Sequence, residues 1–188
     1  METKVYQVLR DNPAMRWTAL LLLALAMFCS YIFMDILSPI KDLMMSQRGW
    51  DSTAFGTMQG AETFLNVFVF FLIFAGIILD KMGVRFTAVL SGAVMLVGAL
   101  IKYYAVSDAF IGSSAEVWFN NNLNYIPVFE ELGVSPFYEG MPASAKLAAI
   151  GFMIFGCGTE MGGITVSRGI VKWFKGRETA LAMGSEMA

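Results

Sequence analysis

The chain has 188 residues, of which 57% are hydrophobic and only 15% are charged, and its formal net charge at pH 7 is −2. Soluble domains carry about 25% charged residues, so this composition indicates an integral membrane protein rather than a soluble domain. The small net charge argues against a nucleic-acid partner. Because the sequence contains no histidine, imidazole metal ligands and imidazole acid–base chemistry are excluded, and neither a metal nor another cofactor is expected.

The first predicted membrane helix covers residues 16–40, after an N-terminal segment at residues 1–15. This apolar run exceeds the ~20 residues that a spanning helix needs. Asn12 and Pro13 stand just before it, and this pair favours the start of a helix.

Three further apolar runs predict the rest of the architecture. The second and third spans are expected at residues 54–79 and 86–105, after an outer loop at residues 41–53, and a charged loop at residues 80–85 joins them. The fourth span is expected at residues 142–171, followed by a loop at residues 172–177 and the start of a fifth span at residues 178–188. The predicted fold class is therefore all-α integral membrane, with four complete transmembrane helices and the beginning of a fifth.

The segment between the third and fourth spans, residues 106–141, is acidic and aromatic and contains no lysine or arginine. Two interpretations remain open: a solvated cap with aromatic side chains at the membrane interface, or a lid or docking surface for a partner. Ile126, Phe129 and Leu132 are spaced so that one short amphipathic turn is expected.

The basic residues predict the orientation. With a cytoplasmic N-terminus, nine of the thirteen lie on the cytoplasmic side, and this bias agrees with the positive-inside rule. The nine are Lys4, Arg10, Arg16, Lys81, Arg85, Arg168, Lys172, Lys175 and Arg177. The four left on the outer side are Lys41, Arg48, Lys102 and Lys146.

Four acidic residues lie inside the apolar runs, where a charge costs a few kcal/mol (about 2.5–3.5 for Asp at a helix centre). They are Asp35, Glu62, Glu160 and Glu186. Such residues almost always face a protein interior or a water-filled path. Together they predict a hydrated cavity for a substrate or a proton, although Asp35 is also close enough to the outer interface to be solvated there.

Small residues inside the spans predict close packing of helices. Gly56 and Gly60 form one GxxxG pair, and Gly158 and Gly162 form another. Cys29 and Cys157 both lie in apolar runs, and they are expected to be buried free cysteines that pack as small apolar side chains.

Two loops resemble signatures of the major facilitator superfamily of transporters. Gly76, Asp80, Lys81, Gly83 and Arg85 match the pattern GxxxDKxGxR of the loop between the second and third helices. In the loop before the fifth helix, "WFKGRE" resembles the corresponding motif and supplies Trp173, Phe174, Gly176, Arg177 and Glu178.

The resemblance implies a fold and a function. The chain would form part of the N-terminal six-helix bundle, and the C-terminal bundle of the same protein would be its partner, together with the lipid bilayer and a solute. The implied function is secondary active or facilitated transport of a small polar organic solute by alternating access, in a bacterial cytoplasmic membrane.

A narrower resemblance, to the branch that contains lysosomal dipeptide transporters and bacterial relatives, implies a dipeptide or another amino-bearing solute. It rests on "CSYIFMDILSPIKDLM", "FLNVFVFFLIFAGIILDKMGVR" and "FGCGTE". In that branch an acid in the position of Glu160 meets the amino group of the substrate. Phe152 departs from the pattern, because many members carry an arginine near that position, and proton coupling through such an arginine is therefore in doubt.

The family also implies roles for the first loop. Gly83 permits a tight turn, and Gly76 lets a neighbouring helix approach closely. Asp80, at the end of the second span, is expected to bond with Arg85 and to face the N-terminus of a helix in the C-terminal bundle. That contact would hold the cytoplasmic gate shut. The alternative is that the charges only anchor the loop and fix the topology.

Two other functions were compared with transport. A complete four-helix membrane protein could act as an oligomeric scaffold or a channel. A membrane enzyme is disfavoured, because the sequence offers no metal cluster and no nucleophile–base pair.

Overall fold

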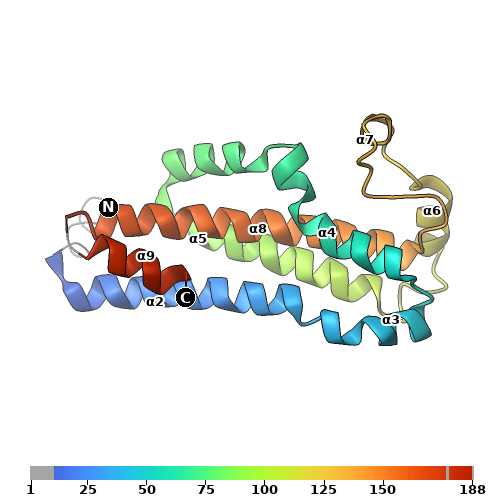
Figure 1. Ribbon diagram of the computed structural model, residues 1–188, viewed down its shortest axis with the longest axis horizontal. Helices are drawn as coiled ribbons and strands as arrows, with labels where there is room; N and C mark the ends of the chain where they lie inside the picture. The colour runs from blue at the N-terminus through green and yellow to red at the C-terminus, as the bar shows by residue number, and fades with distance from the viewer. Residues whose placement is uncertain (1–10, 177, 188) are drawn as a thin grey trace.

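The computed structural model describes residues 11–176 and 178–187 (Figure 1). Within these ranges the chain forms helices and no strands, which confirms the predicted all-α class. Three stretches are long and apolar enough to cross a membrane: Pro13–Arg48, Phe71–Ala105 and Ala143–Trp173. The elements are α2 (Pro13–Asp35), the 3-10 turn η1 (Ser38–Ile40), α3 (Lys41–Arg48), α4 (Ser52–Phe68), α5 (Phe71–Ala105), α6 (Ser114–Asn122), α7 (Pro127–Glu131), α8 (Ala143–Trp173) and α9 (Thr179–Met187).

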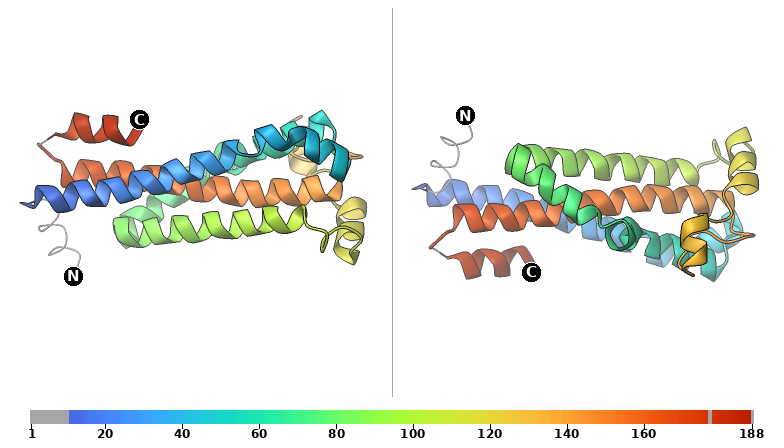
Figure 2. Two further views of the ribbon diagram at one scale, coloured as in Figure 1. Left: turned by 90° about the horizontal axis from the view of Figure 1, so that it is seen from below. Right: turned by 90° about the horizontal axis from the view of Figure 1, so that it is seen from above.

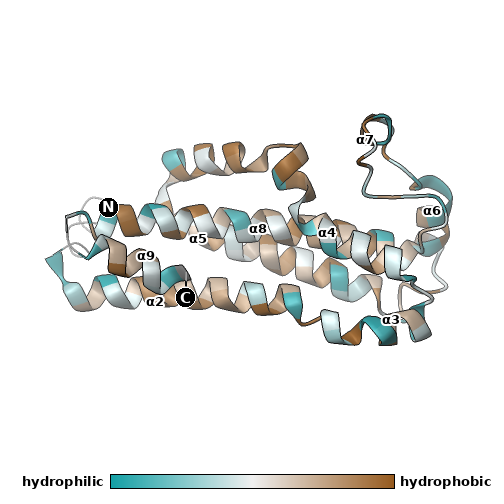
Figure 3. Ribbon diagram, viewed as in Figure 1, coloured by the Kyte–Doolittle hydropathy of each residue, from teal (hydrophilic) through white to brown (hydrophobic). Residues whose placement is uncertain are grey.

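The long helices lie side by side and define two ends of the bundle (Figure 1). The end at which α2 begins and α8 finishes also contains the bend of α5 at Gly83, and we call it the Gly83 end. The opposite end carries α3, α6 and α7, and we call it the α6 end. Figure 3 shows hydrophobic residues along the long helices and more hydrophilic residues toward the α6 end.

Helix α8 is the centre of the bundle. It contacts α2, α4, α5, α6 and α9, and Figure 2 shows it running between α2 and α5. Most of its residues are buried, whereas α2 and α5 bury few of theirs. Cys157 on α8 is buried as predicted, but Cys29 is exposed, because α2 contacts its neighbours along only one side.

A close contact between helices joins α5 and α8 at Gly98 and Gly151. A Cβ atom on Gly98 would lie 2.5 Å from the carbonyl oxygen of Gly151, and one on Gly151 would lie 2.8 Å from the carbonyl oxygen of Gly98. The two backbones therefore touch where neither helix has a side chain. Ser91 adds a hydrogen bond of 2.8 Å to the carbonyl oxygen of Gly158.

Of the two predicted GxxxG pairs, one packs against neighbouring helices and the other does not within the described residues. Gly158 and Gly162 face α5 and α2, since Cβ atoms there would meet Met95 and Met27. Among the described residues nothing lies within 4 Å of a Cβ atom at Gly56 or Gly60, so the close packing predicted for that pair is wrong within this part of the chain. Both lie on the exposed side of α4.

The second predicted span, residues 54–79, is broken into two helices. Helix α4 ends at Phe68 and α5 begins at Phe71, and between them Phe70 has a left-handed backbone with φ 54° and ψ 38°. Aromatic packing explains the break: Phe64 and Phe68 pack against Phe129 of α7, with ring centroids 4.8 and 6.2 Å apart. The end of α4 is therefore held against α7, and the chain must change direction before it continues.

Gly83 forms the turn between the two halves of α5. Its φ of 82° and ψ of 168° lie in a region open almost only to glycine. Thr87 donates a hydrogen bond of 2.9 Å to the carbonyl oxygen of Gly83 and supports the start of the second half. Residues 71–82 and 84–105 thus form a helical hairpin in the region where the sequence predicted a loop.

The acidic segment packs onto the α6 end of the bundle. Phe110 and Phe137 are buried, and the hydroxyl group of Tyr138 donates a hydrogen bond of 3.1 Å to Asp51. Trp50, just before α4, donates a hydrogen bond of 2.8 Å to Ser144 at the start of α8. Helix α7 lies where the short amphipathic turn was predicted.

Candidate functional site

Three of the four predicted intramembrane acids converge on one tyrosine. Glu62 from α4, Glu160 from α8 and Glu186 from α9 lie within electrostatic range of Tyr31, which α2 supplies and which is 54% exposed. Glu160 also acts on Glu62. Glu62 is only 6% exposed, while Glu160 and Glu186 are half-buried. Four helices thus contribute to one acidic cluster.

Gly156 brings α4 and α8 close together at this cluster. A Cβ atom on Gly156 would overlap the backbone carbonyl oxygen of Glu62 and would lie 3.0 Å from its Cγ atom. Gly156 stands one helical turn before Glu160 on α8. The missing side chain therefore lets the two carboxylates approach from facing helices.

Helix α4 carries two further polar residues on the same face. Gln59, Glu62 and Asn66 are spaced by three and four residues, which places them along one side of a helix. Gln59 donates a hydrogen bond of 3.1 Å to the carbonyl oxygen of Met34. Asn66 is 9% exposed, and neither atom of its amide has a hydrogen-bond partner within the described ranges. This stripe was not predicted, although the spacing of the three polar residues in an apolar run could have revealed it.

Asp35 does not join the acidic cluster. It is the last residue of α2, and its side chain is exposed. The helix ends at Asp35 because the 3-10 turn η1, which contains Pro39, begins three residues later. The placement matches the solvated alternative for this residue rather than a role in the cavity.

The predicted gating motif surrounds a hollow at the Gly83 end. Asp80, Lys81 and Gly83 line a pocket of about 370 Å³ together with Arg168, Lys172 and Lys175 from the end of α8 and the loop after it. The Asp80 carboxylate lies 3.1 Å from the guanidinium group of Arg168. Asp80 was predicted to bond with Arg85, and this prediction is wrong: Arg85 lies beyond the bend at Gly83, with an exposed side chain. Gly76 faces open space within 4 Å, so the close approach of a helix predicted there is also wrong within the described residues.

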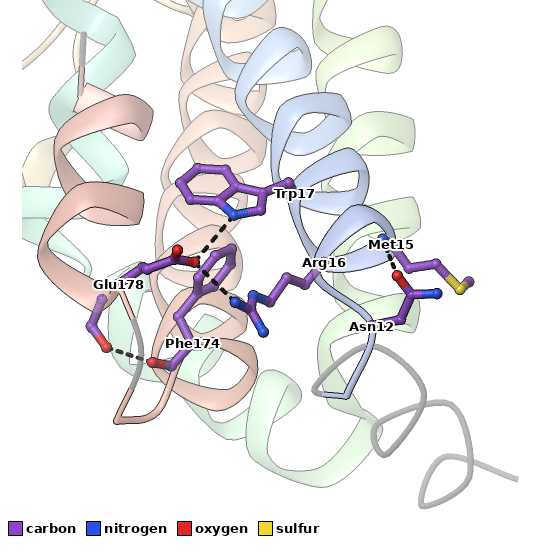
Figure 4. Close-up of polar contacts among 7 residues, drawn as sticks. Asn12, Met15, Arg16, Trp17, Phe174 and Glu178 are labelled. Carbon is purple, nitrogen blue, oxygen red and sulfur yellow. Dashed lines mark hydrogen bonds and ion pairs between the residues drawn. The ribbon is translucent and has the colours of Figure 1, made fainter.

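The second motif ties α2 to the loop between α8 and α9 (Figure 4). The carboxylate of Glu178 accepts hydrogen bonds from the Arg16 guanidinium group at 2.9 Å and from the Trp17 indole at 3.3 Å. Phe174 lies beneath both donors, 5.2 Å from the Arg16 guanidinium carbon and 5.0 Å from the Trp17 ring.

The other motif residues complete this corner of the bundle. Trp173 and Phe174 are buried, and Gly176 has a φ of 73°. Arg177 lies outside the described residues. The contribution of Arg16 and Trp17 was not predicted, because their common partner Glu178 follows about 160 residues later in the chain.

A buried lysine at the α6 end was also missed. Lys102 was assigned to the outer side of the membrane, but it lies within the last turn of α5 and is only 5% exposed. Its ammonium group lies 3.4 Å from the centre of the Phe152 ring and 5.4 Å from that of Phe33. A desolvated cation–π contact contributes about 2 kcal/mol, less than the several kcal/mol that burial of a charge costs. Phe152, where the resemblance led us to expect an arginine, instead contacts the ammonium group of Lys102 on α5 through its ring.

The acidic cluster can bind a cationic group or a proton, since buried carboxylates favour both. Within the described ranges no three His, Cys, Asp or Glu side chains lie close enough together to hold a metal ion. Comparisons with protein families, with curated proteins and with solved structures find no match for this chain.

Proposed function

We propose that this chain forms the first helices of a major facilitator transporter, which moves a small amino-bearing solute across a membrane by alternating access. The close approach of α4 and α8 at Glu62 and Gly156, one helical turn before Glu160, carries the proposal. Charged groups inside membrane helices mark solute and ion paths, and carboxylates contributed by several helices favour a solute with an ammonium group.

The two sequence motifs support the same function. Under this proposal the Asp80–Arg168 ion pair and the basic pocket around it form part of the cytoplasmic gate. The concentration of lysine and arginine at the Gly83 end favours the cytoplasmic side of a bacterial inner membrane for that end. Under this proposal the remaining helices of the twelve-helix architecture belong to the same transporter and supply the other wall of the cavity.

Uptake measurements test the proposal. The complete transporter is reconstituted into liposomes, and uptake of labelled dipeptides, amino acids and sugars is compared. We expect uptake of dipeptides or amino acids and no uptake of sugars. Glu160→Gln and Glu62→Gln should lower it at least tenfold, whereas Glu139→Gln, at an exposed position in the acidic segment, should leave it unchanged.

Two results would overturn the proposal. Uptake of sugars alone contradicts an amino-bearing solute, and equal uptake by the Glu160→Gln variant contradicts the role of the cluster.

The second candidate is an oligomeric four-helix scaffold or channel. It is favoured by the exposed stripe of Leu21, Leu25, Phe28 and Ile32 on α2, which fits a second copy as well as lipid. A stable oligomer that passes ions without saturable uptake would support this candidate.

A further inference from the structure

The hollow at the Gly83 end carries an excess of positive charge. It measures about 370 Å³, and its basic residues are Lys81 at the turn of α5, Arg168 and Lys172 near the end of α8, and Lys175 in the loop after it. Asp80 is the one acidic residue that lines it among the described residues. Its carboxylate pairs with Arg168 at 3.1 Å. That pair is neutral as a whole, so the lysines supply the excess charge.

Two of these lysines are accessible to a ligand. Lys81 and Lys175 are exposed, and neither forms an ion pair with any residue that the structure describes. A lysine binds phosphate as a point charge, without the fixed geometry that an arginine imposes. Because the two lysines come from different segments and line one hollow, they favour an anion with several accepting oxygen atoms.

The position of the hollow favours a lipid as the source of that anion. The hollow lies at the end of α8, which is long and apolar enough to cross a membrane, and therefore at the level of the lipid head groups. Leu79, Val84 and Val171 complete its wall, and Val171 is 48% exposed. Basic pockets between membrane helices bind the head groups of anionic phospholipids.

An apolar surface continues from the hollow along the first half of α5. Ile77 and Ile73 precede Asp80 by three and seven residues, a spacing that places all three on one face of the helix. The two isoleucines are 47% and 63% exposed. A ligand whose phosphate lies in the hollow can therefore extend an acyl chain over them, whereas a soluble phosphate gains nothing from these side chains.

We propose that this hollow binds the phosphate head group of an anionic membrane phospholipid, with Lys81 and Lys175 at the phosphate and the acyl chains against Ile77 and Ile73. The site lies apart from the acidic cluster. It goes beyond the proposed transport function, and binding can be measured whether or not the protein transports a solute.

Lipid binding to the purified full chain in a neutral detergent tests the site, with native mass spectrometry to count the bound lipid. Phosphatidylglycerol is the probe, and we expect saturable binding of one molecule. Phosphatidylcholine, which has the same chains and no net charge, should bind at least tenfold more weakly. Lys81→Gln and Lys175→Gln should each weaken phosphatidylglycerol binding about fivefold, and the double variant at least tenfold.

Arg85→Gln is the matched control. Arg85 is an exposed cation four residues after Lys81 in the same turn, but it does not line the hollow, so its loss should change the affinity less than twofold. Equal affinity for the two lipids, equal affinity of the double lysine variant, or a loss in Arg85→Gln as large as that in Lys81→Gln would overturn the proposal. Glycerol phosphate has the charge without the chains and should not displace the lipid. Displacement at equal concentration would identify a soluble phosphate ligand and overturn the assignment to a phospholipid.

Discussion

Arg168 on α8 reaches the carboxylate of Asp80 on the first half of α5, with 3.1 Å between its guanidinium nitrogen and the carboxylate oxygen. The two side chains are 58% and 67% exposed. An exposed pair of this kind contributes at most about 1 kcal/mol to the stability of the fold. Its importance is therefore expected to lie in transport rather than in folding.

We expect Asp80→Asn and Arg168→Gln to reduce uptake by a similar factor of about five or more, with no further loss in the double variant, since each removes the same pair. Membrane insertion should be retained, with the free energy of unfolding changed by less than about 1 kcal/mol. Uptake into liposomes and chemical unfolding measure the two effects. Arg85→Gln is the control: a loss equal to that of Asp80→Asn would show that Arg85 and not Arg168 is the working partner.

Gly83→Ala should destabilise the protein by about 1–3 kcal/mol, because alanine strains the backbone at φ 82° and ψ 168°. Gly76→Ala, seven residues earlier in the same helix and in open space, should be neutral or stabilising by up to about 1 kcal/mol. Thermal unfolding in detergent compares the two variants. Equal melting temperatures would contradict the role of Gly83 as the turn.

Gly156→Ala should cost about 1–3 kcal/mol, because the added methyl group must push α4 and Glu62 away from α8. The same displacement should weaken solute binding. Gly60→Ala on α4, where space is open, is the matched control. Solute binding and the free energy of unfolding are measured on both variants. If Gly156→Ala leaves both quantities unchanged, the close approach of α4 and α8 at Glu62 is contradicted.

Glu178→Gln should loosen the attachment of α9 to α2. The Arg16 side chain is 4% exposed and that of Glu178 is 49% exposed, so we expect a loss of about 1–2 kcal/mol, toward the low end for a hydrogen bond to a charged group. Hydrogen exchange of the α9 amides should become faster. Arg48→Gln breaks an ion pair of the same 2.9 Å length, but its partner Asp108 is 93% exposed, and this control should leave exchange in α9 unchanged.

Tyr138 should make the stability of the α6 end depend on alkaline pH. Burial first, and then the hydrogen bond and the charge of Asp51, raise the pKa of Tyr138 from 10.0 to about 12. The neutral phenol is favoured in the folded state, so its stabilising contribution is complete below pH 10 and is lost as the pH rises toward 12. Absorbance titration at alkaline pH should show one late-ionising tyrosine that is absent from Tyr138→Phe. A titration unchanged by that substitution would contradict the contact with Asp51.

The sequence predicted the helical class and the apolar segments well, because hydropathy is a local property of the chain. It did not predict that α8 is the buried centre of the bundle. The runs that form α2, α5 and α8 are all apolar, and only the packing of Gly98 against Gly151 and of Gly156 against Glu62 distinguishes α8 from the others. The break at Phe70 was missed for a related reason, since its cause is Phe129, far along the chain.

The candidate site was predictable only in part. The energetic cost of a carboxylate in an apolar run identified Glu62, Glu160 and Glu186 without any knowledge of the fold. That cost cannot separate a residue in the interior from one at a helix end, and Asp35 was therefore included. The partners of Asp80 and Glu178 could not be predicted, because Arg168 and Arg16 are distant in sequence and no spacing rule connects them. Lys102 was placed outside because it stands where an apolar run ends.

Phe70 and Gly83 bound a straight helical piece, residues 71–82, between two places where the backbone leaves helical geometry. The second half of α5 is held to α8 at Gly98 and Gly151, and the first half packs through Ala75 and Leu79; if this half were to pivot, Phe70 would be its hinge. Asp80 lies ten residues from the hinge, about 15 Å along a helix. A rotation of only about 10° at Phe70 swings Asp80 through about 2–3 Å over that distance. A displacement of that size exceeds the reach of a hydrogen bond, so the Asp80–Arg168 pair would be sensitive to the backbone angles at Phe70.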